Sequence, residues 1–406
     1  MNVTRVRHLE NALVHFRRDS TTQTFSAQSI DTHLRTYHAA HKSQLSIDDK
    51  DWLSDKFKDI YRWKSLIEHF SGASNGPSDL LRAYFGSSNW RAYAASKVLA
   101  DHTRFSIPEP LFDALSKQYG KDKAREIAAI YNEKSPVFLR VNPRVSSRED
   151  VLKSMKAVGI AAEPTIHSEL GIKVSRSPKL LQLDVLKNHS CEFQDESCQL
   201  VGAQISKLLT MHKKEGTVSR PIKILDFCSG SGGKSLVFGP SLRGKGHIFL
   251  HDINQAYLQQ ARMKMRAAKI PNFTIMSPND PAYETRLRGK MDYVLVDAPS
   301  TSSGLFRRYP ERKWMFTPEF VSESVDRQRA IFKEAIKYLK GDGKIIYSVS
   351  SILSPETWEQ LKFFCHEHKL FLTYEPVYSL PQSHGMDGFF CAIMERQKQD
   401  KKLAKS

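Results

Sequence analysis

From about residue 190 onward, short apolar runs alternate with helical or loop segments in a regular order. The runs are IKILDF (222–227), HIFLHD (247–252), FTIM (273–276), YVLVDAP (293–299) and KIIYSVS (344–350). Strands that are apolar along their whole length are typical of a parallel sheet that is buried on both faces. This alternation therefore predicts an α/β fold, a doubly wound and mostly parallel sheet with helices on both sides.

The chain before that region has a different pattern. Residues 1–130 carry apolar side chains at three- and four-residue steps, which predicts a helical domain. The segments PVFLRVN, SREDVLKSMKAVGI and GIKVS then indicate a strand, a helix and a returning strand. We therefore expect a helical domain at 1–130, a small RRM-like α/β module at 131–187, a main α/β domain at 188–398 and a basic tail at 399–406.

A glycine-rich loop, LDFCSGSGGKSL (225–236), follows the first of the five apolar runs. Glycines there allow a sharp turn and a close approach of the backbone to a ligand. A P-loop would need glycine where Cys228 stands, and a dinucleotide fingerprint would need glycine where Ser235 stands. The failed spacings favour S-adenosylmethionine, whose binding loop tolerates looser glycine positions.

Asp252 ends the second apolar run, 26 residues after Asp226. A carboxylate at this position can accept hydrogen bonds from the two hydroxyls of a ribose. The alternative interpretation is a helix N-cap.

The charge balance favours a polyanionic partner. Lys and Arg number 61 against 44 Asp and Glu, which gives a net charge of +17. Nucleic acid is the first candidate, and a basic soluble protein with no such partner is the alternative. No apolar run reaches the roughly 18 residues of a membrane span, and nothing in the sequence predicts a metal site.

The compartment stays open on the sequence alone. Five cysteines, an odd number without a Cys-x-x-Cys pair, favour a reducing intracellular compartment. The basic, amphipathic stretch MNVTRVRHLENALVHFRR has two interpretations, a mitochondrial transit peptide or the first helix of the folded domain. Cytoplasm or nucleolus is thus not distinguished from mitochondrion.

Six motifs, in order, carry a resemblance to a known family. They are FLRVNP (138–143), FQDESCQLV (193–201), DFCSGSGGK (226–234), VDAPSTSSGLFRRYPERKW (296–314), YSVSSILSPE (347–356) and HGMDGFFCAIMER (384–396). Over residues 135–396 the chain resembles the RsmB/NSUN-type (Sun/Nop) RNA cytosine-5 methyltransferases. The resemblance implies a Rossmann-like methyltransferase fold, S-adenosylmethionine as cofactor and RNA as substrate, with ribosomal RNA favoured.

The resemblance also implies a reaction that we do not expect this chain to perform. In the family, a cysteine thiolate after the fifth strand adds to carbon 6 of cytosine, and a second cysteine after the fourth strand assists product release. This sequence has Ser350 at the first position and Ser300 at the second. A thiol with a pKa near ~8.5 is easily ionised, whereas a serine hydroxyl needs an adjacent base.

Other family positions are retained. The cofactor- or base-binding positions implied by the resemblance are Cys228, Ser229, Gly230, Ser231, Gly232, Gly233, Lys234, Asp252, Asn279, Asp280 and Asp297. Asn279 stands where the family usually has a carboxylate near the adenine. Arg307, Arg308, Lys313 and Trp314 match a motif beside the cleft, where we expect contacts with the RNA backbone; a solvated basic loop is the alternative.

Three functions follow as hypotheses. The favoured one is a methyltransferase-fold protein that binds RNA without forming 5-methylcytosine and acts as a scaffold in ribosome assembly, with an assembly protein as a possible partner. The second is an active RNA methyltransferase that uses different chemistry on ribosomal or transfer RNA. The third is a small-molecule methyltransferase, which the charge and the RNA-family modules disfavour.

Overall fold

The computed structural model describes residues 3–19, 29–71, 76–86, 89–214, 221–278 and 282–396. The chain forms two units, and the boundary between them is not a single point in the sequence. One unit comprises 1–135 together with 305–320, and the other comprises 136–304 together with 321–406. The sequence pattern predicted 305–320 as part of the main α/β domain, and it predicted the module at 131–187 as separate from that domain. The observed division differs from the predicted one in both respects.

The first unit is helical in its described N-terminal part. Its helices are α1 (Val3–Asp19), α2 (Ile30–Ala40), α3 (Ile47–Arg62), α4 (Lys64–Ser71), α5 (Pro77–Phe85), α6 (Trp90–Tyr93), α7 (Asp101–Arg104), α8 (Glu109–Tyr119) and α9 (Lys121–Tyr131). A capping box between Ser46 and Asp49 starts α3, which then buries Leu53, Phe57 and Ile60 as the periodicity predicts. Helix α1 also packs into this core, which supports its interpretation as the first helix of the fold.

The second unit begins with a small antiparallel module. Its elements are β1 (Val137–Val141), α10 (Arg148–Ala157), β2 (Ala162–Pro164), β3 (Gly171–Val174), α11 (Asp184–Lys187) and β4 (Cys191–Phe193). The strands pair antiparallel in the order β2-β3-β1-β4. The predicted small α/β module is confirmed, and β4 extends it slightly beyond residue 187.

A larger sheet forms the rest of the second unit. Its strands are β5 (Ile222–Asp226), β6 (Gly246–His251), β7 (Phe273–Met276), β8 (Met291–Asp297), β9 (Leu339–Val349), β10 (Leu370–Leu372), β11 (Val377–Ser379) and β12 (Phe389–Arg396). The order is β10-β12-β9-β8-β5-β6-β7, and β11 pairs with β12. Strands β5 to β9 are parallel, while β12 runs antiparallel to β9.

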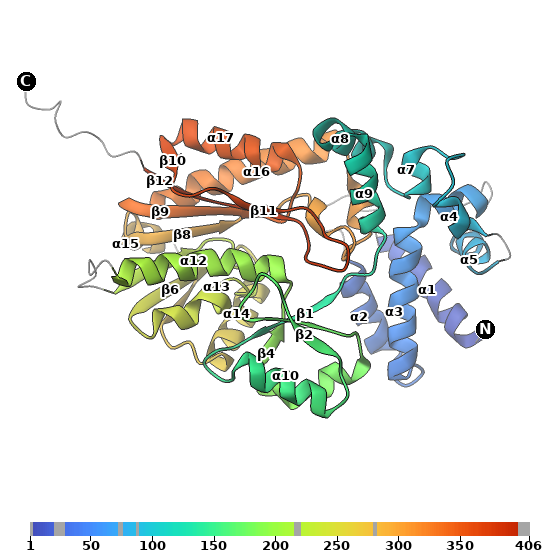
Figure 1. Cartoon of the computed structure of the whole chain (residues 1–406), viewed down its shortest axis with the longest axis horizontal. Coiled ribbons are helices and arrows are strands. Elements are labelled where there is room, and N and C mark those ends of the chain that lie inside the picture. The colour runs from blue at the N-terminus through green and yellow to red at the C-terminus, as the bar shows by residue number, and fades with distance from the viewer. Residues whose placement is uncertain are drawn as a thin grey trace, which may run out of the picture. The chain divides into compact units, whose positions relative to one another are not determined.

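Helices cover both faces of this sheet (Figure 1). They are α12 (Glu196–Lys214), α13 (Ser235–Phe238), α14 (Gln255–Ala267), α15 (Ala282–Leu287), α16 (Pro318–Ala335) and α17 (Trp358–Glu367). Alternate residues of β8 serve the two faces: Leu295 packs in the core with α12 and α14, whereas Val294 and Val296 pack in the core with α16 and α17. The predicted doubly wound α/β fold is confirmed.

This topology fixes where a ligand can bind. From β5 the chain moves to β6 on one side, while β8 pairs with β5 on the other. The connections diverge there, which leaves a crevice beyond the carboxyl ends of β5 and β8. In the described residues, no helix combines the length and apolar character that crossing a membrane requires.

Candidate cofactor cavity and the neighbouring serines

The loop after β5 turns sharply at two glycines. Gly230 has a φ of 51° and Gly232 a φ of 81°, a region that glycine adopts without steric cost. The amide of Gly232 donates to the carbonyl of Ser229 at 2.8 Å, and the amide of Ser229 donates to the carbonyl of His251 at 2.9 Å. The loop is thereby attached to the end of β6.

Asp252 holds the same loop from the end of β6. Its Oδ2 accepts a hydrogen bond from the amide of Gly230 at 2.9 Å. The N-cap of α14 is Asn254, whose side chain accepts from the amides of Ala256 and Tyr257. The interpretation of Asp252 as the helix N-cap is therefore wrong.

A cavity of about 180 Å³ lies beside this loop. It is lined by Gln194, Cys198, Asp226, Cys228, Ser229, Ser231, Gly233, Lys234 and Asp297. Most of these are residues that the sequence analysis predicted to bind the cofactor. Gln194, Cys198 and Asp226 were missed as cavity residues, although the first two stand in the quoted motif FQDESCQLV.

Two carboxyl groups in the cavity have different environments. Burial raises the pKa of Asp226 to about 7, although Ser235 Oγ donates to its Oδ2 at 2.8 Å. Asp297 instead forms an ion pair with Lys234. Burial alone would lower the pKa of Lys234, but the Asp297 carboxylate and other acidic groups raise it overall, so the amine stays charged.

Unused polar atoms in the cavity fit a polar ligand. Asp226 Oδ1 and Gln194 Oε1 are buried and have no hydrogen-bond partner in the part of the chain that the structure describes. Both residues line the cavity. A Cβ on Gly233 would approach Gln194 Nε2 to 3.3 Å, so the backbone of the glycine loop lies close against the Gln194 side chain. These residues fit S-adenosylmethionine, with the acceptors of Asp226 and Gln194 available to its donors.

The motif FQDESCQLV joins the small module to this cavity. Gln194 Nε2 donates to the carbonyl of Gly233 at 2.9 Å, so the strand end after β4 supports the glycine loop directly. Glu196 accepts from the amides of His167 and Ser168, in the loop before β3. The motif therefore connects the four-stranded sheet of the small module to the glycine loop of the main sheet.

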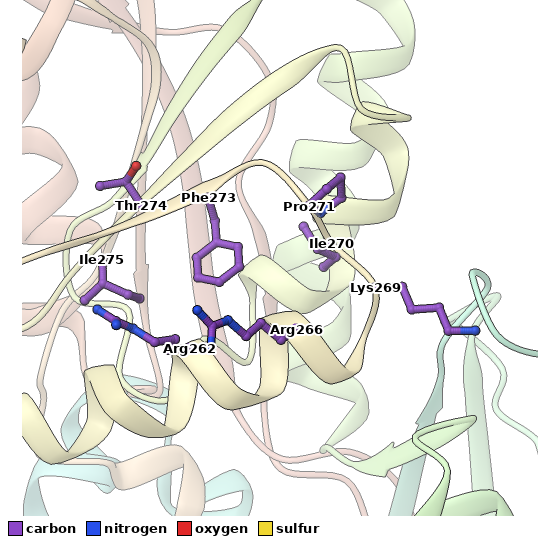
Figure 2. Close-up of a pocket in the computed structure, with 8 residues that line it drawn as sticks. All are labelled: Arg262, Arg266, Lys269, Ile270, Pro271, Phe273, Thr274 and Ile275. Atoms are coloured by element: carbon purple, nitrogen blue, oxygen red, sulfur yellow. The ribbon is translucent and has the colours of Figure 1, made fainter.

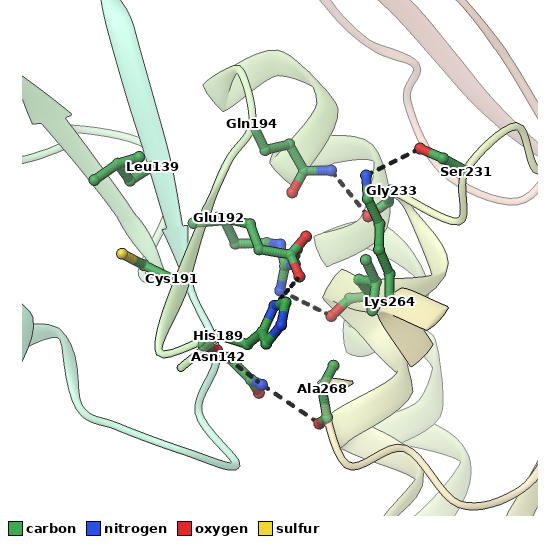
Figure 3. Close-up of polar contacts among 12 residues, drawn as sticks. Leu139, Asn142, His189, Cys191, Glu192, Gln194, Ser231, Gly233, Lys264 and Ala268 are labelled. Carbon is green, nitrogen blue, oxygen red and sulfur yellow. Dashed lines mark hydrogen bonds and ion pairs between the residues drawn. The ribbon is translucent and has the colours of Figure 1, made fainter. Parts of the chain in front are cut away.

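A further contact across the same junction appears in Figure 3, where Asn142 Nδ2 donates to the carbonyl of Ala268 at 3.3 Å. Figure 3 also shows Lys264 Nζ of α14 donating to Ser231 Oγ at 3.1 Å, a contact within the main sheet's own part of the chain that supports the glycine loop. The buried Arg140 donates through Nη1 to the carbonyl of Leu236 at 3.0 Å. The small module is thus held to the main sheet by buried polar contacts.

The two serines that the sequence resemblance predicts at the family cysteine positions, Ser300 and Ser350, lie after neighbouring strands. Asp297 of β8 is opposite Ser348 of β9, so the loops with Ser300 and Ser350 begin next to each other. The amide of Gly304 donates to the carbonyl of Ser350 at 3.1 Å, which joins these loops again. Both serines are half-buried.

Neither serine hydroxyl contacts a basic group among the described residues. Ser300 Oγ accepts from the amide of Ser302 at 3.2 Å, and Ser350 Oγ has no hydrogen bond within the same ranges. The nearest carboxylate along the chain from Ser350 is Glu356, whose oxygens are occupied by Thr301 and Ser351. Among the described residues, no hydrogen bond therefore links either hydroxyl to a base that would activate it.

The cysteines of the cavity do not supply a thiolate. Burial raises the pKa of Cys198 and raises that of Cys228 well above its ordinary value. Burial also raises the pKa of Cys391, on β12, to about 12. These side chains are neutral thiols at neutral pH, and a thiol is a much weaker nucleophile than a thiolate.

The segment 305–320 corrects the prediction of an RNA-contacting loop. Lys313 is fully buried, and its Nζ donates to the carbonyl of Arg62 at 2.6 Å and to Asn132 Oδ1 at 3.0 Å. Trp314 Nε1 donates to the carbonyl of Tyr61 at 2.8 Å. Burial lowers the pKa of Lys313 well below its ordinary value, which favours a neutral amine over a phosphate-binding cation.

Arg307 is also buried in this segment. Its side chain has 0% exposure, and its carbonyl accepts from Arg62 Nη2 at 3.2 Å. A side chain without solvent exposure cannot contact an RNA phosphate, so the predicted RNA contacts of Arg307 and Lys313 are wrong for this structure. Arg308 is half-exposed and stays a candidate. The motif matched the family, but its side chains serve the packing of the helical unit.

Three predicted features fall where the structure gives no description. Asn279 and Asp280 lie outside the described residues, as does the basic tail at 399–406. Within the ranges that are described, no group of three or more His, Cys, Asp or Glu side chains has the arrangement of a metal site.

Two family descriptions match the chain. Residues 209–395 match the 16S rRNA methyltransferase RsmB/F family, and residues 107–180 match the ferredoxin-like domain of RsmF/B-like methyltransferases. The second match agrees with the antiparallel module that begins at β1, although it starts within the helical unit.

Curated relatives have the same family character. The chain is 28% identical over 271 residues to the ribosomal RNA small subunit methyltransferase B of Proteus mirabilis, a match that covers 66% of this chain and 60% of the relative. It is 27% identical to the probable ribosomal RNA small subunit methyltransferase B of Bacillus subtilis, covering 73% of this chain and 67% of the relative. The chain thus spans less than two thirds of the length of the Proteus mirabilis protein.

Solved structures agree on the fold. The crystal structure of PH0851 aligns with a TM-score of 0.76 at 16% identity, covering 98% of this chain and 99% of that protein. NSun6 from Pyrococcus horikoshii, solved with SFG, aligns with a TM-score of 0.60 at 18% identity, covering 72% of this chain and 99% of that protein. The cofactor of this methyltransferase family is S-adenosylmethionine, which the glycine loop and the cavity fit. By these two matches, which follow each other along the chain, residues 107–180 and 209–395 belong to the RsmB/F family of methyltransferases.

Proposed function

We propose that this protein binds S-adenosylmethionine and structured RNA, does not form 5-methylcytosine, and acts as an RNA scaffold in ribosome assembly. Ribosomal RNA is the favoured RNA because the curated relatives are named as ribosomal RNA small subunit methyltransferases. The observation that carries the proposal is the pair Ser300 and Ser350, at the positions that resemble the two family cysteines. Neither hydroxyl contacts a base among the described residues.

Physical chemistry explains why the substitution matters. Addition to carbon 6 of cytosine needs a nucleophile that loses its proton at neutral pH with little cost, which a thiol does and an unactivated hydroxyl does not. Loss of an activated nucleophile commonly lowers the rate by many powers of ten, about a millionfold in a serine protease. The polar wall of the cofactor cavity is retained, so ligand binding does not depend on the lost reaction.

Methylation mapping tests the proposal directly. RNA crosslinked to the protein in cells is identified, and bisulfite sequencing of that RNA compares cells with and without the protein. We expect no 5-methylcytosine that depends on the protein, and no covalent complex between purified protein and RNA carrying 5-fluorocytosine. A cytosine whose methylation disappears with the protein and returns with purified protein and cofactor would overturn the proposed loss of activity.

Calorimetry tests the cofactor part of the proposal separately. We expect S-adenosylmethionine to bind the full chain and Asp252→Ala to bind it more weakly, because the side chain holds Gly230 and offers acceptors to a ribose. Asp342→Ala, on an exposed part of β9, is the matched control and should bind as the unchanged protein does. Absence of heat at millimolar cofactor would contradict cofactor binding while leaving RNA binding intact.

The second candidate is an RNA methyltransferase that acts on a nitrogen or an oxygen. The observation that favours it is the polar lining of the cavity in the described residues, with the Lys234–Asp297 pair in place. Such a reaction needs no covalent adduct, so the serines would not prevent it. Mass spectrometry of nucleosides from the crosslinked RNA, after incubation with methyl-labelled cofactor, distinguishes the two candidates: labelled nucleosides other than 5-methylcytosine support this one.

A further inference from the structure

A groove of about 600 Å³ lies at the edge of the main sheet, apart from the cofactor cavity. We call it the edge groove; its walls include Arg262 and Arg266 of α14, Lys269, and Phe273, Thr274 and Ile275 of β7. Figure 2 shows the two arginine side chains rising from the helix toward the strand that carries Phe273 and Ile275. The groove is open to solvent and has both basic and apolar walls.

The strand in this groove has one unpaired side. Strand β7 is at the end of the strand order and pairs with β6 alone among the described strands. The amide of Ile248 donates to the carbonyl of Asn272 at 3.0 Å, and Ile248 is opposite Phe273. In a parallel ladder the main-chain groups of the opposite residue then point away from the partner strand. Phe273, and by the same alternation Ile275, therefore direct N–H and C=O groups to the open edge.

The charge of the groove is of one sign. Arg262, Arg266 and Lys269 are exposed, and within the ranges that the structure describes their side chains form neither ion pairs nor hydrogen bonds. No acidic residue is among those that line the groove. Unpaired cations around an apolar floor favour an occupant that combines anionic with apolar groups.

The geometry points to an acidic peptide in an extended conformation, and we propose that such a peptide binds the edge groove by adding to β7 as a further strand. Alternate side chains of an added strand are spaced by roughly 6.6 Å on one face. Arg262 and Arg266 are one helical turn apart, a rise of about 6.0 Å along α14. Acidic side chains at two alternate positions therefore match the two arginines, while the peptide backbone pairs with the open edge of β7.

RNA is the other anionic macromolecule to consider, and the groove favours it less. An RNA strand could neutralise the arginines, but its backbone has no alternating donors and acceptors that match a strand edge. The half-buried Phe273 and Ile275 also offer an apolar surface that suits aliphatic side chains. A positively charged rim can also protect an open edge from aggregation, and this explanation requires that no strand bind there.

Fluorescence anisotropy with the full chain tests the proposal. The probe is a fluorescein-labelled peptide of about eight residues in which Glu alternates with Val. We expect it to bind, and we expect Arg262→Glu combined with Arg266→Glu to lower its affinity at least roughly tenfold because two attractive contacts become repulsive. The matched control, Lys153→Glu with Lys156→Glu on α10, carries the same charge change on exposed residues and should bind as before.

Changes in the peptide separate strand addition from simple charge attraction without altering the protein. A peptide with Lys in place of Glu should bind the arginine-reversed protein better than the unchanged one. N-methylation of alternate peptide amides should abolish binding, since it removes the donors that pair with β7. Three outcomes would overturn the proposal. They are equal binding of the N-methylated and parent peptides, no binding of the parent peptide, and arginine-dependent binding of a single-stranded RNA oligonucleotide instead of the peptide.

Discussion

Glu356 is a buried carboxylate that holds the two loops next to the cavity together. It has 0% exposure and accepts hydrogen bonds from Thr301 Oγ1 at 2.5 Å and from Ser351 Oγ at 2.5 Å. Ser324 Oγ and Gln328 Nε2 donate to its other oxygen at 2.7 and 3.0 Å. A buried carboxylate is stable only with such donors, and here they come from α16 and from the two loops that carry Ser300 and Ser350.

We expect Glu356→Ala to destabilise the protein by about 3–5 kcal/mol, because it leaves several buried donors without an acceptor. Glu356→Gln keeps the volume and one carbonyl oxygen, so its loss should be clearly smaller. Urea unfolding of the two variants at neutral pH measures the difference. A loss below about 1 kcal/mol for the alanine variant would show that the donors find other partners.

The buried carboxyl of Asp226 should make the free energy of unfolding depend on pH. Its pKa in the folded protein is raised by burial to about 7, above the value of about 4 expected in the unfolded chain. The folded state therefore binds more protons between these values, and its free energy of unfolding falls as the pH rises from about 4 to about 7, by at most about 4 kcal/mol.

The measurement compares the unchanged protein with Asp226→Asn by urea unfolding across this pH range. The difference in stability between the two proteins should shift in favour of the asparagine variant as the pH increases. A difference that is constant with pH would mean that Asp226 titrates at its ordinary value.

The segment 305–320 shows how one loop can belong to a distant part of the chain. It lies between β8 and the main part of α16, but it packs within the helical unit. Lys313 and Trp314 contact carbonyls of Arg62 and Tyr61, and Ile30 donates its amide to Glu311 Oε1 at 3.2 Å. The chain therefore passes between the two units at three points, near residues 135, 304 and 320.

We expect Lys313→Ala to loosen the helical unit, since it leaves the carbonyl of Arg62 and Asn132 Oδ1 without the buried donor, at about 1–3 kcal/mol for each acceptor. Hydrogen exchange measured by mass spectrometry should show faster exchange in α3, α9 and 305–320. Lys117→Ala, on an exposed position of α8, is the control and should leave exchange unchanged. Unaltered protection in the Lys313 variant would contradict the role of the buried amine.

The charge of the complete chain determines how it should bind RNA. A net charge of +17 favours attraction to the phosphate backbone, and the burial of Arg307 and Lys313 assigns that attraction to other cations. Binding that releases counterions from RNA weakens linearly on a plot of log affinity against log salt concentration. The slope reports the number of phosphates neutralised.

We expect a steep negative slope for a stem-loop RNA taken from small-subunit ribosomal RNA, measured by filter binding at several salt concentrations. Arg308→Glu should weaken binding and reduce the slope by about one or more. Lys117→Glu, on the exposed face of α8, provides the comparison for a single charge reversal elsewhere. A slope near zero for the unchanged protein would exclude the backbone-dominated binding that the net charge favours.

Local pattern was sufficient to predict the main fold and the position of the cofactor loop. Apolar runs such as 293–296 are short and buried, and the order in which they follow helices leaves few topologies for a parallel sheet. The glycine spacing and Asp252 are also local features, and both lie where the sequence placed them, at the carboxyl ends of β5 and β6. Chemistry that depends on residue type alone, such as the serines at 300 and 350, needed no structure to be noticed.

Only the tertiary structure decided the burial and the hydrogen-bond partners of side chains that contact residues distant in the sequence. Lys313 meets an acceptor 251 positions away and Trp314 one 253 positions away, so no local pattern could distinguish a buried lysine from an RNA-binding one. Glu356 reaches Thr301 across 55 positions, and Gln194 reaches the glycine loop across 39. Long-range packing removes these groups from water. Because of this desolvation, the basic residues Arg307 and Lys313 contribute to packing and not to RNA contacts, and the pKa of Asp226 is raised to about 7.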